Sequence, residues 1–304
     1  MLMKIRRFLL RSLKEMKFLP QKMYVSLLYE YATEKKINLK NPAEFNEKIQ
    51  WYKVYYRVKL LNQLVDKFEV RAYVKEKIGE QYLNNIYGVY NSGDEVDFDA
   101  LPSKFVIKGI HASGFNLIVD DKEKLDKSAA KKIFRKWLSK NQYFRKGLEW
   151  AYKDVKRRLM AEEFMKEEGR GSLLDYKFYC FNGKAKFFEV HLERAGDYKR
   201  AFYNLDFTKA PFRKGKEELI ITEELEKPSN FDEMVVLANK LADKLPFVRV
   251  DFYSVNGKSV FGEMTFYPGD GRHDFYPDEY NKIIGDLMVL PKIPKGQKYI
   301  TEIS

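Results

Sequence analysis

Hydrophobic and polar residues alternate along four segments of this chain, and the segments form two pairs, each separated by an Asn-Gly dipeptide. Alternation with a period of two is typical of strands that bury one face, and Asn-Gly favours the tight turn of a β-hairpin. We therefore predict two antiparallel hairpins. They comprise residues 174–181 and 184–192 around Asn182-Gly183, and residues 247–255 and 258–266 around Asn256-Gly257.

Apolar residues spaced three or four positions apart predict helices elsewhere. Residues 1–80 mostly follow this pattern, with one helix opening at Asn41-Pro42-Ala43-Glu44 and another over residues 66–78. Asn230-Phe231-Asp232-Glu233 resembles a capping box, so we predict that a further helix begins there.

Two short strands are predicted at residues 105–108 and 116–119, around a Gly-containing turn, and basic helices follow within residues 126–158. The hairpins are thus interleaved with helices along the chain. This order predicts an α+β fold rather than a doubly wound parallel sheet.

The composition is that of a globular protein: 45% of the 304 residues are hydrophobic, which is enough for a core and excludes a wholly disordered chain. The single Cys180 excludes an intramolecular disulfide, and the three histidines are too far apart for a zinc-ligand motif. No apolar run approaches the roughly 18–20 residues that cross a bilayer, and the chain does not begin with a signal-peptide core. We expect a cytoplasmic protein.

The formal net charge is +12, and the excess of Lys and Arg lies in residues 1–22 and 122–158. The first segment mixes apolar and basic residues, as a helix lying in the plane of an anionic membrane does, although a helix packed on the protein body has the same pattern. We hypothesise a peripheral contact with the inner face of the membrane. The second segment lacks a recognisable nucleic-acid-binding motif, so we expect no nucleic-acid partner.

Acidic residues on the second hairpin are candidates for metal binding. Side chains alternate along a strand, so Arg249 shares a face with Asp251, and Glu263 shares one with Thr265. A two-residue loop would put Asp251 and Glu263 on opposite faces, whereas an odd loop with Gly257 as a left-handed bulge residue would put them together. We predict the odd loop, because two carboxylates on one buried face suit Mg²⁺ with water or phosphate completing its coordination.

Several of these segments occur in an order that resembles the TupA-like ATP-grasp family of bacterial surface-polysaccharide clusters. The resemblance extends from about residue 41 to about residue 290. It rests on Asp66-Lys67, Phe105-Val106-Ile107-Lys108 before a loop of small residues, Met160 to Met165, Asp175-Tyr176-Lys177-Phe178, and Arg249-Val250-Asp251 with Glu263-Met264-Thr265.

The resemblance implies an ATP-grasp architecture, in which two antiparallel-sheet subdomains clasp a nucleotide and a helical region precedes them. It divides the chain into four parts. These are a basic helical arm (residues 1–40), a helical pre-grasp region (41–100), a first ATP-grasp subdomain with the basic helices (101–160) and a second subdomain with the metal site (161–304).

The resemblance also assigns the cofactors ATP and Mg²⁺ and most of their contacts. A strand-end lysine and a small-residue loop would bind the phosphates, and the segment joining the two sheets would hold the adenine. The implied ATP contacts are Lys67, Lys108, His111, Ser113, Gly114, Glu162, Glu163, Phe164, Met165 and Lys177.

For catalysis the resemblance implies that Arg249 and Lys108 stabilise the phosphoryl group during transfer, and that Asp251 and Glu263 hold Mg²⁺. Thr265 stands where many ATP-grasp enzymes have Asn, and a hydroxyl is the weaker metal ligand. The family implies a carboxylate–amine ligase that forms an amide through an acyl phosphate, acting in capsule or teichuronic-type polysaccharide synthesis.

The substrate implied by the family is a uronic acid or an amino acid, with its carboxylate or phosphate bound by basic side chains. Two alternatives stay open: a phosphotransferase or glycosyltransferase of the same pathway with a hydroxyl acceptor, and a non-catalytic binder of anionic polymer or membrane. The candidate substrate contacts are Arg194, Arg200, Arg272 and His273.

Overall fold

The computed structural model describes residues 16, 18–167, 173–194, 197–215 and 217–303. Most of the basic segment at residues 1–22 therefore lies outside the described residues, and its membrane contact stays a prediction. Within the described part of the chain, no helix is both long and apolar enough to span a bilayer.

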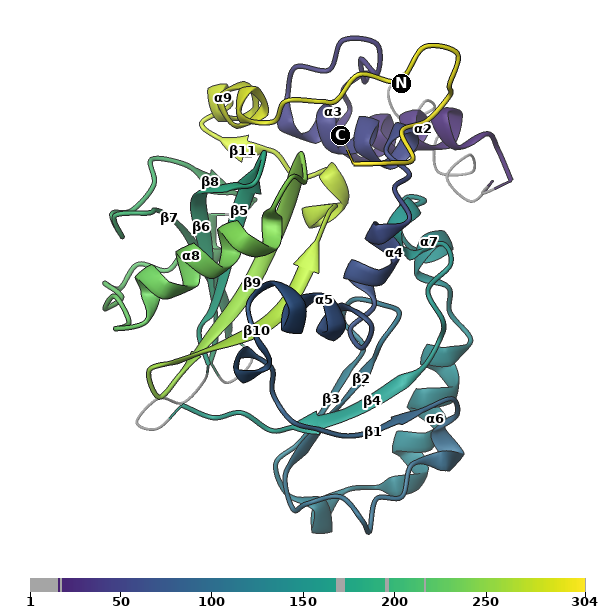
Figure 1. Cartoon of the computed structure of the whole chain (residues 1–304), viewed down its shortest axis with the longest axis vertical. Helices are drawn as coiled ribbons and strands as arrows, with labels where there is room; N and C mark the ends of the chain where they lie inside the picture. The colour runs from purple at the N-terminus through teal and green to yellow at the C-terminus, as the bar shows by residue number, and fades with distance from the viewer. Residues whose placement is uncertain (1–15, 17, 168–172, 195–196, 216, 304) are drawn as a thin grey trace.

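A five-stranded antiparallel sheet contains both predicted hairpins (Figure 1). Its strand order is β10-β9-β5-β6-β7, so β9 of the second hairpin pairs with β5 of the first. Helix α8 (Phe231–Ala242) covers one face of this sheet and contributes Met234 and Leu237 to the core. The strands are β5 (Asp175–Phe181), β6 (Lys184–Arg194), β7 (Asp197–Asn204), β9 (Phe247–Val255) and β10 (Lys258–Thr265).

A smaller sheet has the order β1-β4-β2-β3 and is also antiparallel. Helix α6 (Lys127–Leu138) packs on it through Phe134. The sheet crosses two of the expected subdomain boundaries, since β1 comes from the region expected to be helical and β4 spans residue 160. Its strands are β1 (Ile86–Tyr90), β2 (Phe105–Gly109), β3 (Asn116–Val119) and β4 (Leu159–Glu163).

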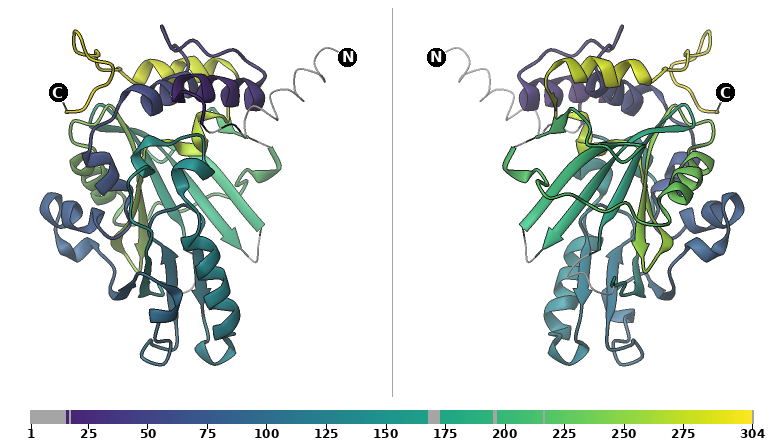
Figure 2. Two further views of the ribbon diagram at one scale, coloured as in Figure 1. Left: turned by 90° about the vertical axis from the view of Figure 1, so that its right-hand side faces the viewer. Right: turned by 90° about the vertical axis from the view of Figure 1, so that its left-hand side faces the viewer.

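Two mixed helix-and-sheet regions thus confirm the predicted α+β class. A helical layer made of α2, α3 and α9 lies across one end of the large sheet (purple and yellow in Figure 2). The other elements are α2 (Gln21–Thr33), α3 (Phe45–Tyr55), α4 (Leu60–Val65), α5 (Val70–Lys77), α7 (Gln142–Arg145), α9 (Glu279–Leu287), β8 (Arg213–Lys214), β11 (Phe275–Tyr276) and the 3₁₀ turns η1 (Glu80–Tyr82), η2 (Gly93–Glu95), η3 (Lys122–Lys124), η4 (Trp150–Tyr152), η5 (Glu217–Leu219) and η6 (Pro268–Gly271).

Helix α3 begins close to the predicted position and joins the helical layer to the sheet. The Glu47 carboxylate accepts the backbone N–H groups of Ala43 and Glu44 at 2.9 and 3.2 Å, which caps the first turn. The next residue, Phe45, is fully buried, and its ring centroid lies 5.1 Å from that of Phe247 and 5.8 Å from that of Phe275.

The contact between α3 and α9 depends on a glycine. A Cβ at Gly285 would lie 2.2 Å from the Ala43 carbonyl oxygen, and backbone cannot yield as a flexible side chain can. We therefore expect Gly285→Ala to lower the free energy of unfolding by about 1–3 kcal/mol, the usual cost of overpacking. Urea denaturation measures this, with Ile283→Ala on the exposed side of α9 as the control. Equal stability of Gly285→Ala and the unmodified protein would contradict the packing described.

The predicted capping box at Asn230 is wrong. Asn230 precedes α8, but its side chain makes no hydrogen bond to the helix backbone. It accepts from the Ser254 hydroxyl and donates to the Ser259 hydroxyl, both at 2.9 Å. Hydroxyl groups of the β9–β10 hairpin have replaced the helix N–H as partners, and this anchors α8 to the hairpin.

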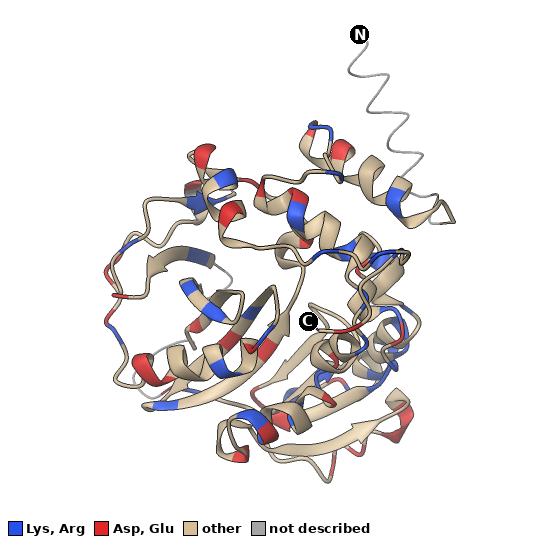
Figure 3. Cartoon of the chain, turned by 45° about the horizontal axis from the view of Figure 1, so that its top comes forward, with Lys and Arg blue, Asp and Glu red and all other residues tan. Residues whose placement is uncertain are grey.

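Acidic segments are interspersed with the basic ones over the described chain (Figure 3). On α6, for example, Arg135 pairs with Asp94 at 3.1 Å and Lys127 pairs with Asp99 at 2.6 Å. The absence of a nucleic-acid partner remains a prediction.

Candidate active site

The β9–β10 hairpin brings the two candidate metal carboxylates together, but not through the predicted loop. Val255 pairs with Lys258, so Asn256-Gly257 is a two-residue turn, with φ of +50° and +75°. The odd-loop prediction is therefore wrong.

The register changes instead at Gly262, between Phe261, which pairs with Phe252, and Glu263, which pairs with Asp251. This β-bulge moves Glu263 to the face that carries Asp251. A Cβ at Gly262 would lie 3.1 Å from the Asp251 carbonyl oxygen, so a small residue suits the bulge.

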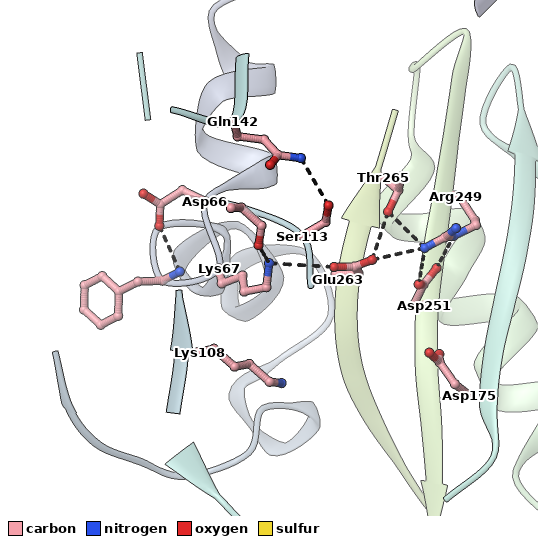
Figure 4. Close-up of polar contacts among 12 residues, drawn as sticks. Asp66, Lys67, Lys108, Ser113, Gln142, Asp175, Arg249, Asp251, Glu263 and Thr265 are labelled. Carbon is pink, nitrogen blue, oxygen red and sulfur yellow. Dashed lines mark hydrogen bonds and ion pairs between the residues drawn. The ribbon is translucent and has the colours of Figure 1, made fainter. Parts of the chain in front are cut away.

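Arg249 joins both carboxylates (Figure 4). Its Nε and Nη2 donate to the two carboxylate oxygens of Asp251 at 2.7 and 2.6 Å, and Nη2 also donates to Glu263 Oε1 at 3.1 Å. The Thr265 hydroxyl accepts from the same Nη2 at 3.1 Å and donates to Glu263 Oε1 at 3.2 Å. The four residues thus form one hydrogen-bonded group, with both carboxylates turned toward the same guanidinium nitrogen.

Lys177 extends this group onto β5, where it lies opposite Asp251. Its Nζ donates to Asp251 Oδ2 at 2.7 Å and also pairs with Asp175. Burial alone would lower the pKa of Lys177, but the two carboxylates outweigh it and raise the pKa above the ordinary value. Asp175 was not assigned a role from the sequence, and its Oδ1 is buried with no hydrogen-bond partner in the described chain.

Two lysines face this group from the smaller-sheet side. Lys67, between α4 and α5, donates to the Ala112 carbonyl at 2.7 Å, and its Nζ lies 3.9 Å from Glu263 Oε2. Burial opposes ionisation of Glu263, but Lys67 and Arg249 together lower its pKa to about 2. Lys108 ends β2 and pairs with Glu162 of β4.

A narrow cavity separates the two sheets here. Its volume is about 20 Å³, smaller than a nucleobase, so adenine binding would require the lining side chains or the sheets to move apart. Four of its ten lining residues, Lys67, Lys108, Glu162 and Met165, are predicted nucleotide contacts. The lining includes Lys67, Lys108, Glu162, Met165, Tyr253 and Gly262.

The predicted phosphate loop lies beside Lys67, but its side chains point in different directions. Ser113 Oγ accepts from Gln142 Nε2 at 3.1 Å, and Gly114 has a φ of +72° with open space around its Cβ position. The His111 ring is buried, with Nε2 3.2 Å from the Trp137 carbonyl oxygen at the end of α6. The His111 side chain is therefore packed against the end of α6.

The predicted adenine hinge comprises the last two residues of β4, Glu162 and Glu163, and the two residues that follow, Phe164 and Met165. Glu163 accepts from Asn85 Nδ2 at 2.8 Å and lies beyond Glu162 on the strand. Phe164 and Met165 are half-buried, and Met165, but not Phe164, borders the narrow cavity.

The candidate substrate residues divide into two groups. Arg200 donates to Glu189 Oε1 at 3.4 Å and to the Lys214 carbonyl at 2.6 Å, and the exposed His273 lies near the same lysine. Arg272 pairs with Asp270. Arg194 ends β6, and its side chain lies outside the described part of the structure.

A comparison of the sequence with protein-family models identifies the family of this chain. The model of the TupA-like ATP-grasp family matches residues 47–289. The chain belongs to the TupA-like ATP-grasp family. No curated protein sequence matches the chain.

The solved structures to which the chain is similar include two D-alanine–D-alanine ligases and a synthetase. The D-alanine–D-alanine ligase of Bacillus anthracis complexed with ATP is 14% identical, with 68% of this chain and 55% of the ligase covered at a TM-score of 0.41. The Helicobacter pylori D-alanine–D-alanine ligase is 14% identical, with 83% and 68% covered at a TM-score of 0.43. An ADP complex of N5-carboxyaminoimidazole ribonucleotide synthetase is 10% identical, with 79% and 56% covered at 0.44. The chain thus covers little more than half of two of these three proteins.

The carboxylates of this TupA-like protein fit Mg²⁺ bound together with a nucleotide. Among the described residues, no three His, Cys, Asp or Glu side chains form a metal cage. Mg²⁺ is commonly held by one or two carboxylates, with water and substrate phosphates completing its octahedral coordination. Asp251 and Glu263, which converge on one cation here, are such a pair, and Thr265 beside them offers a neutral oxygen.

A second buried cluster of charges lies where α3 contacts η4 and η6. Lys53 is fully buried and pairs with Asp270, and Glu149 is 5% exposed beside them. Burial, then repulsion from Asp270, raises the pKa of Glu149 from 4.5 to about 8.

This shift predicts the pH dependence of stability. Between pH 4.5 and 8 the folded protein holds a proton on Glu149 that the unfolded chain has lost. The free energy of unfolding therefore falls as pH rises through this window, by up to about 1.4 kcal/mol per pH unit from this group. We expect Glu149→Gln, which mimics the protonated acid, to flatten that slope in urea denaturation at pH 5, 6, 7 and 8. A variant with the same slope as the unmodified protein would refute the assignment.

Proposed function

We propose that this protein is an ATP-dependent carboxylate–amine ligase that binds Mg²⁺-ATP between its two sheets. One observation carries the proposal: Arg249, Asp251 and Glu263 form a single charged group that faces Lys67 across the interface between the sheets. The family membership supports the same assignment.

The proposed reaction has two steps. A carboxylate oxygen of the acid attacks the γ-phosphorus of ATP, the bond to the β-phosphate oxygen breaks, and ADP leaves. The amine then attacks the acyl phosphate, phosphate leaves, and the amine nitrogen loses a proton to give the amide.

The side chains of the site would mainly position the substrates and stabilise the negative charge of the phosphates, since phosphoryl transfer needs little covalent help from the protein. Mg²⁺, when bound by Asp251 and Glu263, supplies charge neutralisation on the phosphates. Lys67 and Lys108 would hold phosphate oxygens from the opposite side. The planar fork of Arg249 would stabilise the transferring group.

We further propose a uronic acid or an amino acid as the acid, joined during surface-polysaccharide synthesis. The support is the family to which the chain belongs and the basic residues beyond the carboxylates, among them Arg200 and Lys214.

The experiment is to incubate the full chain with Mg²⁺-ATP, hydroxylamine and panels of uronic and amino acids. We expect acid-dependent ADP release together with a hydroxamate, because hydroxylamine traps an acyl phosphate. ADP release that requires a hydroxyl acceptor and yields no hydroxamate would replace the ligase by a phosphotransferase. Absence of Mg²⁺-dependent ATP binding in calorimetry would refute the ATP site itself.

A further inference from the structure

Lys214, on β8, is a buried ammonium group without a carboxylate partner. The residue is 4% exposed, and the Nζ atom lies 5.0 and 5.8 Å from the ring centroids of Phe275 and Phe45. Within the described residues, no hydrogen bond or ion pair satisfies this Nζ. Burial lowers the pKa of Lys214 to about 8. Burying an unpaired charge is costly, so a buried ammonium without an ion-pair partner is a candidate group for binding an anion.

A neutral imidazole and a guanidinium lie close to this ammonium; burial and the neighbouring cations lower the pKa of His273 below its ordinary value. A Cβ built at Gly269 would lie 3.2 Å from His273 Nδ1 and 3.5 Å from Lys214 Nζ, so both nitrogens face the gap above this glycine. Arg200 is held close by, with Nη2 bonded to the Lys214 carbonyl at 2.6 Å.

The neighbouring carboxylates are already in use. Glu189 accepts from the Tyr179 hydroxyl at 3.0 Å, and its Oε1 also lies 3.1 Å from His191 Nε2 and 3.4 Å from Arg200 Nη1. Asp270 is paired with both Lys53 and Arg272. Glu189 and Asp274 act on Lys214 only from beyond ion-pair distance, so its ammonium has no direct carboxylate partner among the described residues.

A cavity of about 700 Å³ is lined by Lys214 and Arg200 together with other residues of β7, β8 and β11. This volume is within the range of small-molecule sites. Its described lining contains no acidic residue, and its aromatic wall includes Phe212 and Tyr276, with Arg213 stacked 4.8 Å from the Tyr276 ring. The cations that line it are Arg200, Lys209, Arg213 and Lys214.

The cavity is near the candidate phosphoryl-transfer site but distinct from it. Glu189, which holds Arg200, lies opposite Lys177, which in turn lies opposite Asp251. Two strand spacings separate Glu189 from Asp251, roughly 10 Å, so one carboxylate cannot contact both places.

We propose that Lys214 and Arg200 bind a second anionic group of the acid substrate, other than the carboxylate that is activated, so that the preferred acid carries two negative groups. This inference rests on the proposed ligase function. The second group is a carboxylate or a phosphate, because both accept from an ammonium and a guanidinium.

The test uses the full chain saturated with Mg²⁺ and a non-hydrolysable ATP analogue, so that the nucleotide phosphate sites are filled. Inorganic phosphate and malonate are titrated separately at pH 7 and constant ionic strength, and binding is followed by thermal stabilisation. We expect at least one anion to stabilise the unmodified protein. Stabilisation by phosphate alone would identify the second group as a phosphate, and stabilisation by malonate alone would identify it as a carboxylate.

Lys214→Met should raise the Kd of that anion at least tenfold without lowering the melting temperature, because it removes a buried unpaired charge. Lys214→Arg should restore most of the binding, and Lys240→Gln on the exposed side of α8 is the matched control.

The inference is overturned if neither anion stabilises the unmodified protein, or if Lys214→Met binds the anion as well as the unmodified protein. If Lys214→Met does not fold, Arg200→Gln is measured instead, and it should also raise the Kd of the anion at least tenfold. Failure of the proposed function has a separate signature, since the Mg²⁺-nucleotide complex itself would then not bind.

Discussion

Asp251→Asn is expected to reduce ADP release by about 100- to 1,000-fold, the usual effect of losing one strong electrostatic contact to a transition state. Both oxygens of Asp251 accept from Arg249, and one also accepts from Lys177. The amide keeps the shape of the side chain but loses its charge, so the metal position loses an anionic ligand, and Arg249 and Lys177 each lose one of their two carboxylate partners.

The measurement is steady-state ADP release, at a temperature where circular dichroism shows the variant folded. Asp286→Asn, which alters an exposed pair with Lys282, is the control and should leave turnover unchanged. Turnover of Asp251→Asn within tenfold of the unmodified protein would mean that Asp251 holds no catalytic metal.

Local patterns were sufficient to predict the strands that carry this site. The alternation around Asn256-Gly257 correctly placed Arg249 and Asp251 on one strand face, because that depends only on the period of a strand. The alignment of Glu263 with Asp251 depended on the bulge at Gly262, which the sequence analysis did not anticipate. The predicted loop placed the extra residue in the turn, with Gly257 as a bulge residue. In the structure, both Asn256 and Gly257 adopt the left-handed conformation that a two-residue loop requires.

Other features were missed for different reasons. Strand β1 has a β-rich run, Ile86-Tyr87-Gly88-Val89-Tyr90, between Asn-containing segments, so a local signal existed and was overlooked. Glu189 and His191 share the face of Lys177 only because the register of β5 with β6 shifts between Tyr179 and Cys180; the two-residue hairpin at Asn182-Gly183, continued without a shift, would pair Lys177 with Phe188. Lys214 had no such signal, because a two-residue strand has no period and its burial comes from Phe45 and Phe275, far away in sequence.

Arg249→Lys is expected to lower kcat by about 100-fold while the KM for ATP changes less than about threefold. The positive charge survives, so the attraction to the nucleotide phosphates is largely kept. The geometry does not survive, because the guanidinium binds both oxygens of Asp251 and also reaches Glu263, whereas an ammonium is a point charge that cannot form this planar fork.

The kcat and KM for ATP of this variant should be compared with those of Arg135→Lys, on the exposed side of α6, where the arginine makes a single ion pair with Asp94. A loss confined to kcat indicates an interaction that strengthens in the transition state. If instead KM rose and kcat stayed within fivefold, Arg249 would contribute only to ground-state binding, and the stabilisation of the transferring phosphoryl group would have to come from Lys67, Lys108 and Lys177.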